Sequence, residues 1–87
     1  MNYFLIWTQR AYDDLADIWV ASDVSTRERI EKALLRLNED LRINPWPIGE
    51  SREANVRMVF VGPIGVVFQI EEAEQTVRVG HVWKNGK

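Results

Sequence analysis

The side chains best suited to act on a phosphate group lie in the second half of this 87-residue chain. Arg57 and Arg78 carry planar guanidinium groups, which bind phosphate through paired N–H donors. Glu50 is a candidate general base, and Arg52, in the same polar run, is a further candidate phosphate ligand. His81 is the only histidine, and its side chain is the natural candidate for proton transfer near neutral pH.

Each of these residues also has a purely structural interpretation. The two arginines could instead pair with Gln69 or with carboxylates at the rim of a sheet. A lone histidine is more often structural than catalytic, and the run from Glu50 to Glu53 could be a solvated loop. The residues alone leave both interpretations open.

Composition excludes several classes of protein. The chain has no cysteine, so it has neither a disulfide framework nor a cysteine-based zinc site, and one histidine cannot build a histidine-rich metal centre. We therefore expect no metal and no cofactor. No apolar run approaches the roughly 20 residues that span a bilayer, and the apolar start at residues 1–7 has no basic leader. These features predict a cytoplasmic protein without a membrane segment.

The charge is unevenly distributed. The net charge is −2, but residues 1–50 hold six Lys/Arg against nine Asp/Glu, whereas residues 51–87 hold five against four. A site for an anion is therefore expected in the C-terminal part, although the overall balance argues against tight electrostatic capture of nucleic acid.

Two helices are expected to follow a short strand. Residues 2–7 are rich in aromatic and branched side chains, which favours a strand. Thr8 is a suitable N-cap for a helix over residues 9–22, with Trp7 and Tyr12 at the positions of a hydrophobic staple. Ser25 and Glu28 form a capping box that would open a second helix, which Pro45 ends. The short connection predicts an antiparallel helical hairpin.

From Val56 onwards the apolar pattern changes to a period of two, which predicts strands over residues 56–61, 66–70 and 76–83. The chain is thus expected to be one α+β domain over residues 1–87: a short N-terminal strand, an antiparallel helical hairpin and a three-stranded antiparallel sheet. One sheet face should pack on the helices; its expected members are Val56, Met58, Phe60, Val66, Phe68, Ile70, Val77 and Val79. His81 alternates with Val79 and should share that face.

The opposite face is expected to remain uncovered, because two helices cover only one side of the sheet. Its expected members are Arg57, Val59, Gly65, Val67, Gln69, Arg78, Gly80 and Val82. Valines exposed beside two arginines indicate a partner, whose acidic and apolar residues would cover both. Val59, Val67 and Val82 are therefore the expected contacts of that partner.

The order of elements, with G-E-S-R before the sheet, R-M-V-F-V-G-P-I-G-V-V-F-Q-I and then V-R-V-G-H-V-W, resembles the RelE/ParE toxin superfamily over about residues 3–84. The resemblance implies a toxin of a bacterial type II toxin–antitoxin pair, bound by a cognate antitoxin in a hetero-oligomer. RelE-like members cut messenger RNA in the ribosome without a metal, whereas ParE-like members poison DNA gyrase. Gly65 and Val82 stand where RelE-like nucleases usually carry arginine.

The RelE-type hypothesis assigns a role to each candidate. Arg57 and Arg78 would hold the phosphate, His81 or Glu50 would transfer protons, and Arg52 and Lys84 would bind RNA. The alternative, favoured by the missing arginines, is a gyrase inhibitor or an inactive homologue that only binds its antitoxin.

Overall fold

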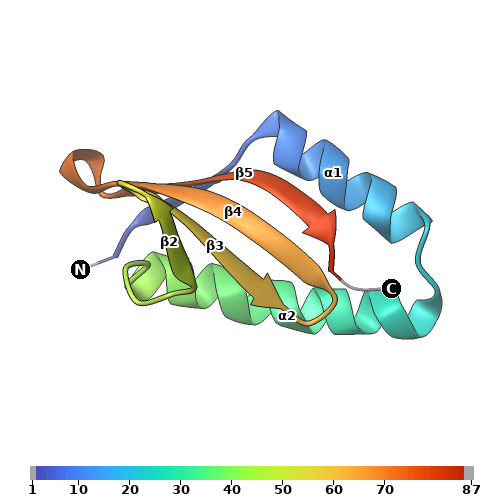
Figure 1. The fold of residues 1–87 in the computed structure, drawn as a ribbon. Helices are drawn as coiled ribbons and strands as arrows, with labels where there is room; N and C mark the ends of the chain where they lie inside the picture. The colour runs from blue at the N-terminus through green and yellow to red at the C-terminus, as the bar shows by residue number, and fades with distance from the viewer. Residues whose placement is uncertain (1, 86–87) are drawn as a thin grey trace.

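The computed structural model describes residues 2–85 as an α+β fold with two helices and a mixed five-stranded sheet (Figure 1). The bounds of the elements in chain order are β1 Phe4–Trp7, α1 Gln9–Val20, α2 Val24–Ile43, β2 Glu50–Glu53, β3 Val56–Val61, β4 Ile64–Glu71, a 3-10 turn Glu72–Glu74 and β5 Thr76–Lys84. The strand order is β1-β5-β4-β3-β2. This arrangement confirms the predicted fold class and the two helices.

The start of α1 is as predicted, whereas that of α2 differs. The Thr8 hydroxyl accepts a hydrogen bond from the Ala11 N–H at 3.1 Å, and the Trp7 and Tyr12 rings lie 5.9 Å apart. Helix α2 begins before the expected capping box, because the Asp23 carboxylate caps it by accepting from the Thr26 N–H at 2.8 Å. An aspartate satisfies a free helical N–H as well as a serine does, so it competes for this position.

The sheet has two strands more than the three predicted. β1 pairs in parallel with β5, from Phe4 opposite Thr76 to Trp7 opposite Val79. β2, which the sequence presents as a polar run, pairs antiparallel with β3 at the other edge. All four residues of β2 are exposed, so no burial pattern marks it as a strand.

The register of the β3–β4 hairpin sets the faces of β3, and it corrects the predicted faces. The turn is confined to Gly62 and Pro63, because Val61 pairs with Ile64 and Val59 with Val66. Gly62 has φ +54°, a conformation that glycine adopts without strain. Residues paired across a ladder share a face. Val59 therefore packs toward the helices, and the prediction that it lies on the uncovered face is wrong.

A second irregularity reverses the end of β5. Val67 of β4 pairs with His81, but its neighbour Phe68 pairs with Val79, which leaves Gly80 as the extra residue of a β-bulge. Beyond the bulge Val82 is buried with 2% exposure. The predictions that Val82 lies on the uncovered face and His81 on the helix face are therefore both wrong: each side chain is on the opposite side.

The core lies between the two helices and one face of the sheet. α1 runs along β5, while α2 contacts β1 and β3 (Figure 1). The fully buried apolar side chains are Ala11, Ile30, Leu37, Leu41, Ile64, Val66, Phe68, Ile70, Val77, Val79 and Val82. We call the other side of the sheet, which no element of residues 2–85 covers, the outer face.

Candidate functional site

The outer face consists of three rows of side chains that run across the strands. The rows follow from the strand register and are Val56–Gln69–Arg78, Glu50–Met58–Val67–His81 and Phe60–Gly65–Trp83. Gly80, the bulge residue, separates Arg78 from His81 along β5. Two ionisable groups of opposite character, His81 and Glu50, therefore stand at the two ends of the middle row.

Arg57 does not lie on the outer face. It pairs with Phe68, a core residue, and its guanidinium donates hydrogen bonds to the carbonyl oxygens of Ile48 at 2.8 Å and Gly49 at 2.9 Å. The expectation that Arg57 and Arg78 share one face is thus wrong, because their partners Phe68 and Gln69 are consecutive in β4 and point in opposite directions. In this structure Arg57 fastens the α2–β2 connection to the sheet.

Arg78 lies on the outer face and is paired. Its Nη2 is 3.2 Å from Glu71 Oε1, and its Nε is 3.4 Å from Glu71 Oε2. The hydrogen bonds from Arg78 hold the pKa of Glu71 below its usual range and raise that of Arg78. This is the carboxylate pairing that was the structural alternative. A shallow hollow of about 170 Å³ adjoins this arginine, with Gln69, Val67 and Gly80 in its lining.

His81 is held by a carboxylate that the sequence did not single out. Asp14 of α1 reaches past the edge of β5, where its Oδ2 lies 2.6 Å from His81 Nδ1 and accepts the Val82 backbone N–H at 3.1 Å. Arg10 Nε is 3.9 Å from the same oxygen. Burial opposes ionisation of Asp14, but the hydrogen bonds from Val82 and His81 outweigh it, so the pKa of Asp14 is lowered. The His81 side chain remains 38% exposed.

Aromatic rings fix the other side of His81. The Trp83 ring stacks on the imidazole with centroids 5.4 Å apart and planes at 29°, and Phe60 meets Trp83 edge-on at 5.9 Å. Gly65 makes this possible, since a Cβ built there would lie 2.4 Å from two Trp83 ring atoms. An arginine at position 65, as RelE-like nucleases usually have, would therefore require Trp83 to move.

The remaining candidates are dispersed. Three strand spacings separate the backbones of Glu50 and His81, roughly 14 Å, so the two residues lie at opposite ends of the middle row. Arg52 lies in the irregular part of exposed β2. Lys84 pairs with the core residue Ile64, so its side chain leaves β5 on the helix side. Hydrogen bonds from Thr26 lower the pKa of Asp23 there, and the charge of Lys84 adds to this effect. Of the proposed catalytic residues only His81 and Arg78 are neighbours on the outer face.

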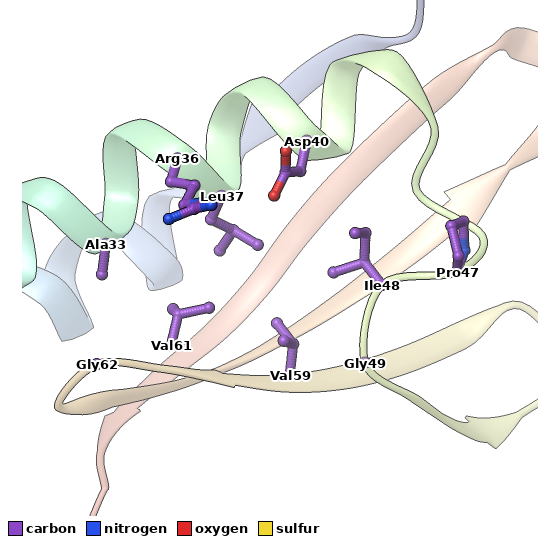
Figure 2. A pocket seen from close by; sticks show the side chains of 10 residues that line it. All are labelled: Ala33, Arg36, Leu37, Asp40, Pro47, Ile48, Gly49, Val59, Val61 and Gly62. Carbon is purple, nitrogen blue, oxygen red and sulfur yellow. The ribbon is translucent and has the colours of Figure 1, made fainter.

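A larger hollow than the one beside Arg78 lies between α2 and β3. It has a volume of about 410 Å³ and is lined by Ala33, Arg36, Leu37, Asp40, Pro47, Ile48, Gly49, Val59, Val61 and Gly62. Figure 2 shows Leu37 and Ile48 directed toward Val59 and Val61, with Arg36 and Asp40 on the α2 rim. We call this hollow the α2–β3 groove. Of the three valines predicted to meet a partner, Val59 lines this groove, Val67 lies on the outer face, and Val82 is buried.

Within residues 2–85 no three histidine, aspartate or glutamate side chains cluster as metal ligands would. No helix in the same part of the chain is both long and apolar enough to cross a membrane.

A family of known proteins matches nearly the whole chain. The family model described as ParE toxin of the type II toxin–antitoxin system parDE matches residues 5–87. This chain belongs to the ParE toxin family. It is therefore a toxin of a type II toxin–antitoxin system, within the RelE/ParE superfamily that its sequence resembles. A search of curated proteins finds no match.

Solved structures share the fold of this ParE-family chain at low sequence identity. The toxin–antitoxin complex RelBE2 of Mycobacterium tuberculosis contains a chain 21% identical, with a TM-score of 0.74 and coverage of 98% of this chain and 100% of that one. A chain of the chromosomal ParDE system of P. aeruginosa is 18% identical, with a TM-score of 0.66 and coverage of 94% of this chain and 95% of that one. A chain of the intact RelBE complex of E. coli is 24% identical, with a TM-score of 0.57 and coverage of 98% of this chain and 99% of that one.

Proposed function

We propose that this toxin inhibits growth by cleaving messenger RNA on the ribosome, with His81 as the proton-transfer group. The observation that carries the proposal is the Asp14–His81 pair on a sheet face that residues 2–85 leave uncovered. An imidazole with one nitrogen held by a carboxylate and a second nitrogen that can exchange a proton is an arrangement used for general acid–base catalysis. The location of the ribosome implies a cytoplasmic site of action.

The reaction that suits this pair is an internal transesterification of RNA. His81 Nε2 would accept the proton of a ribose 2′-hydroxyl, and the 2′-oxygen would form a bond to the adjacent phosphorus. The bond from phosphorus to the 5′-oxygen then breaks, and that oxygen takes a proton from water. The products are a 2′,3′-cyclic phosphate and a 5′-hydroxyl, after which the imidazolium returns its proton to solvent. Arg78, beyond Gly80 on the same face, is the nearest candidate along β5 for holding the phosphate.

The test is expression of the toxin without antitoxin, followed by mapping of messenger 5′ ends. We expect new ends within translated frames, and His81→Gln should reduce them by about a hundredfold, the lower range for loss of a general base. Arg36→Gln, on the far side of the fold, is the control and should cut normally. Absence of new ends in the wild type would reject the nuclease.

A second candidate is gyrase inhibition through binding alone. It is favoured by the dispersal of the cations: Arg57 is bound to carbonyl oxygens on the helix side, and Arg78 is neutralised by Glu71. A metal-free nuclease needs cations that converge on the phosphorane. Under this alternative, purified toxin should inhibit supercoiling by gyrase and cause DNA damage in cells, with messenger RNA intact.

We also propose that a cognate antitoxin neutralises the toxin in a hetero-oligomer. Structural neighbours of this chain come from toxin–antitoxin complexes. The α2–β3 groove suits an apolar anchor of such a partner, because its walls are apolar and its rim offers one cation, Arg36, and one anion, Asp40. Val67 on the outer face remains a candidate contact, and its coverage by the antitoxin would block access to His81.

A further inference from the structure

We propose that Asp14 is a positioning residue, which holds His81 in the tautomer that carries its proton on Nδ1 and its lone pair on Nε2. The inference deepens the proposed RNA cleavage and rests on it for its catalytic consequence. No sequence motif marks Asp14, because 67 residues separate it from His81 and the two meet only where α1 lies along β5. Its role is read from three contacts on a single oxygen atom.

The hydrogen bonds to Asp14 Oδ2 determine which imidazole nitrogen carries the proton. The Val82 backbone N–H can only donate, so the oxygen that it meets at 3.1 Å is an acceptor. An ionised carboxylate accepts at every contact, which requires a donor at His81 Nδ1, 2.6 Å from the same oxygen. A neutral imidazole has one N–H. With that N–H at Nδ1, Nε2 is the basic atom, and it is the nitrogen that a hydroxyl substrate would meet.

The surroundings oppose any other orientation of the ring. Trp83 stacks on one face of the imidazole, and Gly65 leaves the space in which Trp83 lies. If the ring flipped, Nδ1 would leave the carboxylate and lose its charge-assisted hydrogen bond. Asp14 is itself fixed, because its oxygen also satisfies an N–H at the part of the β5 edge that β1 does not reach. The base is thus oriented before substrate arrives.

Asp14 would also act during the reaction itself. When Nε2 takes a proton the ring becomes an imidazolium, and the adjacent carboxylate stabilises that charge. Arg10, 3.9 Å from Asp14 Oδ2, and the backbone N–H of Val82 keep this carboxylate ionised. The Lys84 side chain leaves β5 on the helix side, and the Arg78 guanidinium is paired with Glu71. Neither cation is directed toward the imidazole.

The first test is a ¹⁵N spectrum of the side chain, which requires no activity. Because the chain has a single histidine, the two imidazole nitrogen signals are assigned without ambiguity. In the neutral imidazole we expect the single proton on Nδ1 and none on Nε2. Asp14→Ala should abolish this preference, while Asp17→Asn, at an exposed carboxylate on the same helix, should leave it unchanged. A wild-type spectrum with the proton on Nε2 would overturn the inference.

The second test measures cleavage of ribosome-bound messenger by the full chain. Asp14→Asn keeps an oxygen for both hydrogen bonds but removes the charge, so we expect kcat to fall about tenfold or more with little change in KM. Asp14→Glu should restore part of the loss, and the rate should not fall further when Asp14→Asn is added to His81→Gln. If adding Asp14→Asn to His81→Gln lowered the rate by as much as Asp14→Asn lowers it in the wild type, the role of Asp14 would be merely structural.

The two tests separate the inference from the proposed function. If the wild type does not cut RNA, the nuclease proposal fails and the catalytic role of Asp14 fails with it, whatever the spectrum shows. If the wild type cuts RNA but the proton is on Nε2, RNA cleavage stands and the positioning role is wrong.

Discussion

Replacement of Gly65 by alanine should destabilise the fold, because the added methyl group has no room. A Cβ at this position would lie 2.4 Å from Trp83 Cε2 and Cζ2, and 2.8 Å from Trp83 Nε1. Ordinary contacts between carbon atoms are about 3.5–4 Å, so the rigid indole must move by roughly 1 Å. Overpacking of this kind costs about 1–3 kcal/mol, and each kcal/mol lowers the Tm of a domain of this size by about 4–8 °C.

Gly80→Ala is the matched control on the same face. A Cβ at Gly80 meets nothing within 4 Å, so the exchange should be neutral or stabilise the protein by up to about 1 kcal/mol through the unfolded chain. Thermal unfolding followed by circular dichroism gives both values, and tryptophan fluorescence reports displacement of Trp83. If Gly65→Ala is as stable as Gly80→Ala, the stacking of Trp83 over Gly65 does not exist as described.

Three further changes test other contacts. Arg57→Met should lower the free energy of unfolding by about 1–2 kcal/mol in a urea titration, because the hydrogen bonds to the α2–β2 connection are lost. The rate of RNA cleavage should change by no more than about threefold. Complete loss of cleavage would show that Arg57 acts in the site. Hydrogen bonds from Tyr3 and then Trp46 lower the pKa of Glu72, so its contribution to stability is complete at neutral pH and is lost as pH falls below about 5. Glu72→Gln should therefore flatten the fall in urea midpoint between about pH 6 and pH 3, and an unchanged slope would exclude this pairing. Ala33→Asp should weaken antitoxin binding in calorimetry by at least tenfold, about 1.4 kcal/mol, by placing a charge in the α2–β3 groove, whereas exposed Leu35→Asp should not; equal affinities would place the antitoxin elsewhere.

Much of the fold follows from local chemistry. Thr8 caps its helix as its side chain predicts, and Pro45 follows the end of α2. The apolar alternation in β4 and in the first half of β5 correctly identifies Phe68, Val77 and the other core valines there. These signals act over a few residues, so the sequence alone contains them.

The errors arise where alternation does not determine the face. In β3 apolar residues occupy both faces, and only the two-residue turn at Gly62 and Pro63 shows that Val59 turns inward. In β5 the bulge at Gly80 reverses the pattern after Val79. A one-residue shift moves every later side chain to the other face, so strict alternation predicts the wrong face for both His81 and Val82.

The candidate site depends on contacts between distant segments, so little of it can be predicted from the sequence. Asp14 lies in a run of helical aspartates that looks like a solvated surface, and only the packing of α1 along β5 brings it to His81. Conversely, Arg57 has the residue type of a phosphate ligand, but its strand register turns it toward backbone carbonyl oxygens. Residue type makes His81 a candidate for proton transfer, but nothing near it in the sequence indicates Asp14, whose carboxylate lies against it.

The most direct test of the central claim uses ribosomes programmed with a short synthetic messenger. Purified toxin should cut the normal messenger and fail to cut one carrying a single 2′-deoxyribose at the scissile position, because His81 would have no hydroxyl proton to take. His81→Gln should slow cleavage of the normal messenger by about a hundredfold. Equal cleavage of both messengers would contradict the account. It would also be contradicted if the toxin cut neither messenger and instead inhibited supercoiling by gyrase.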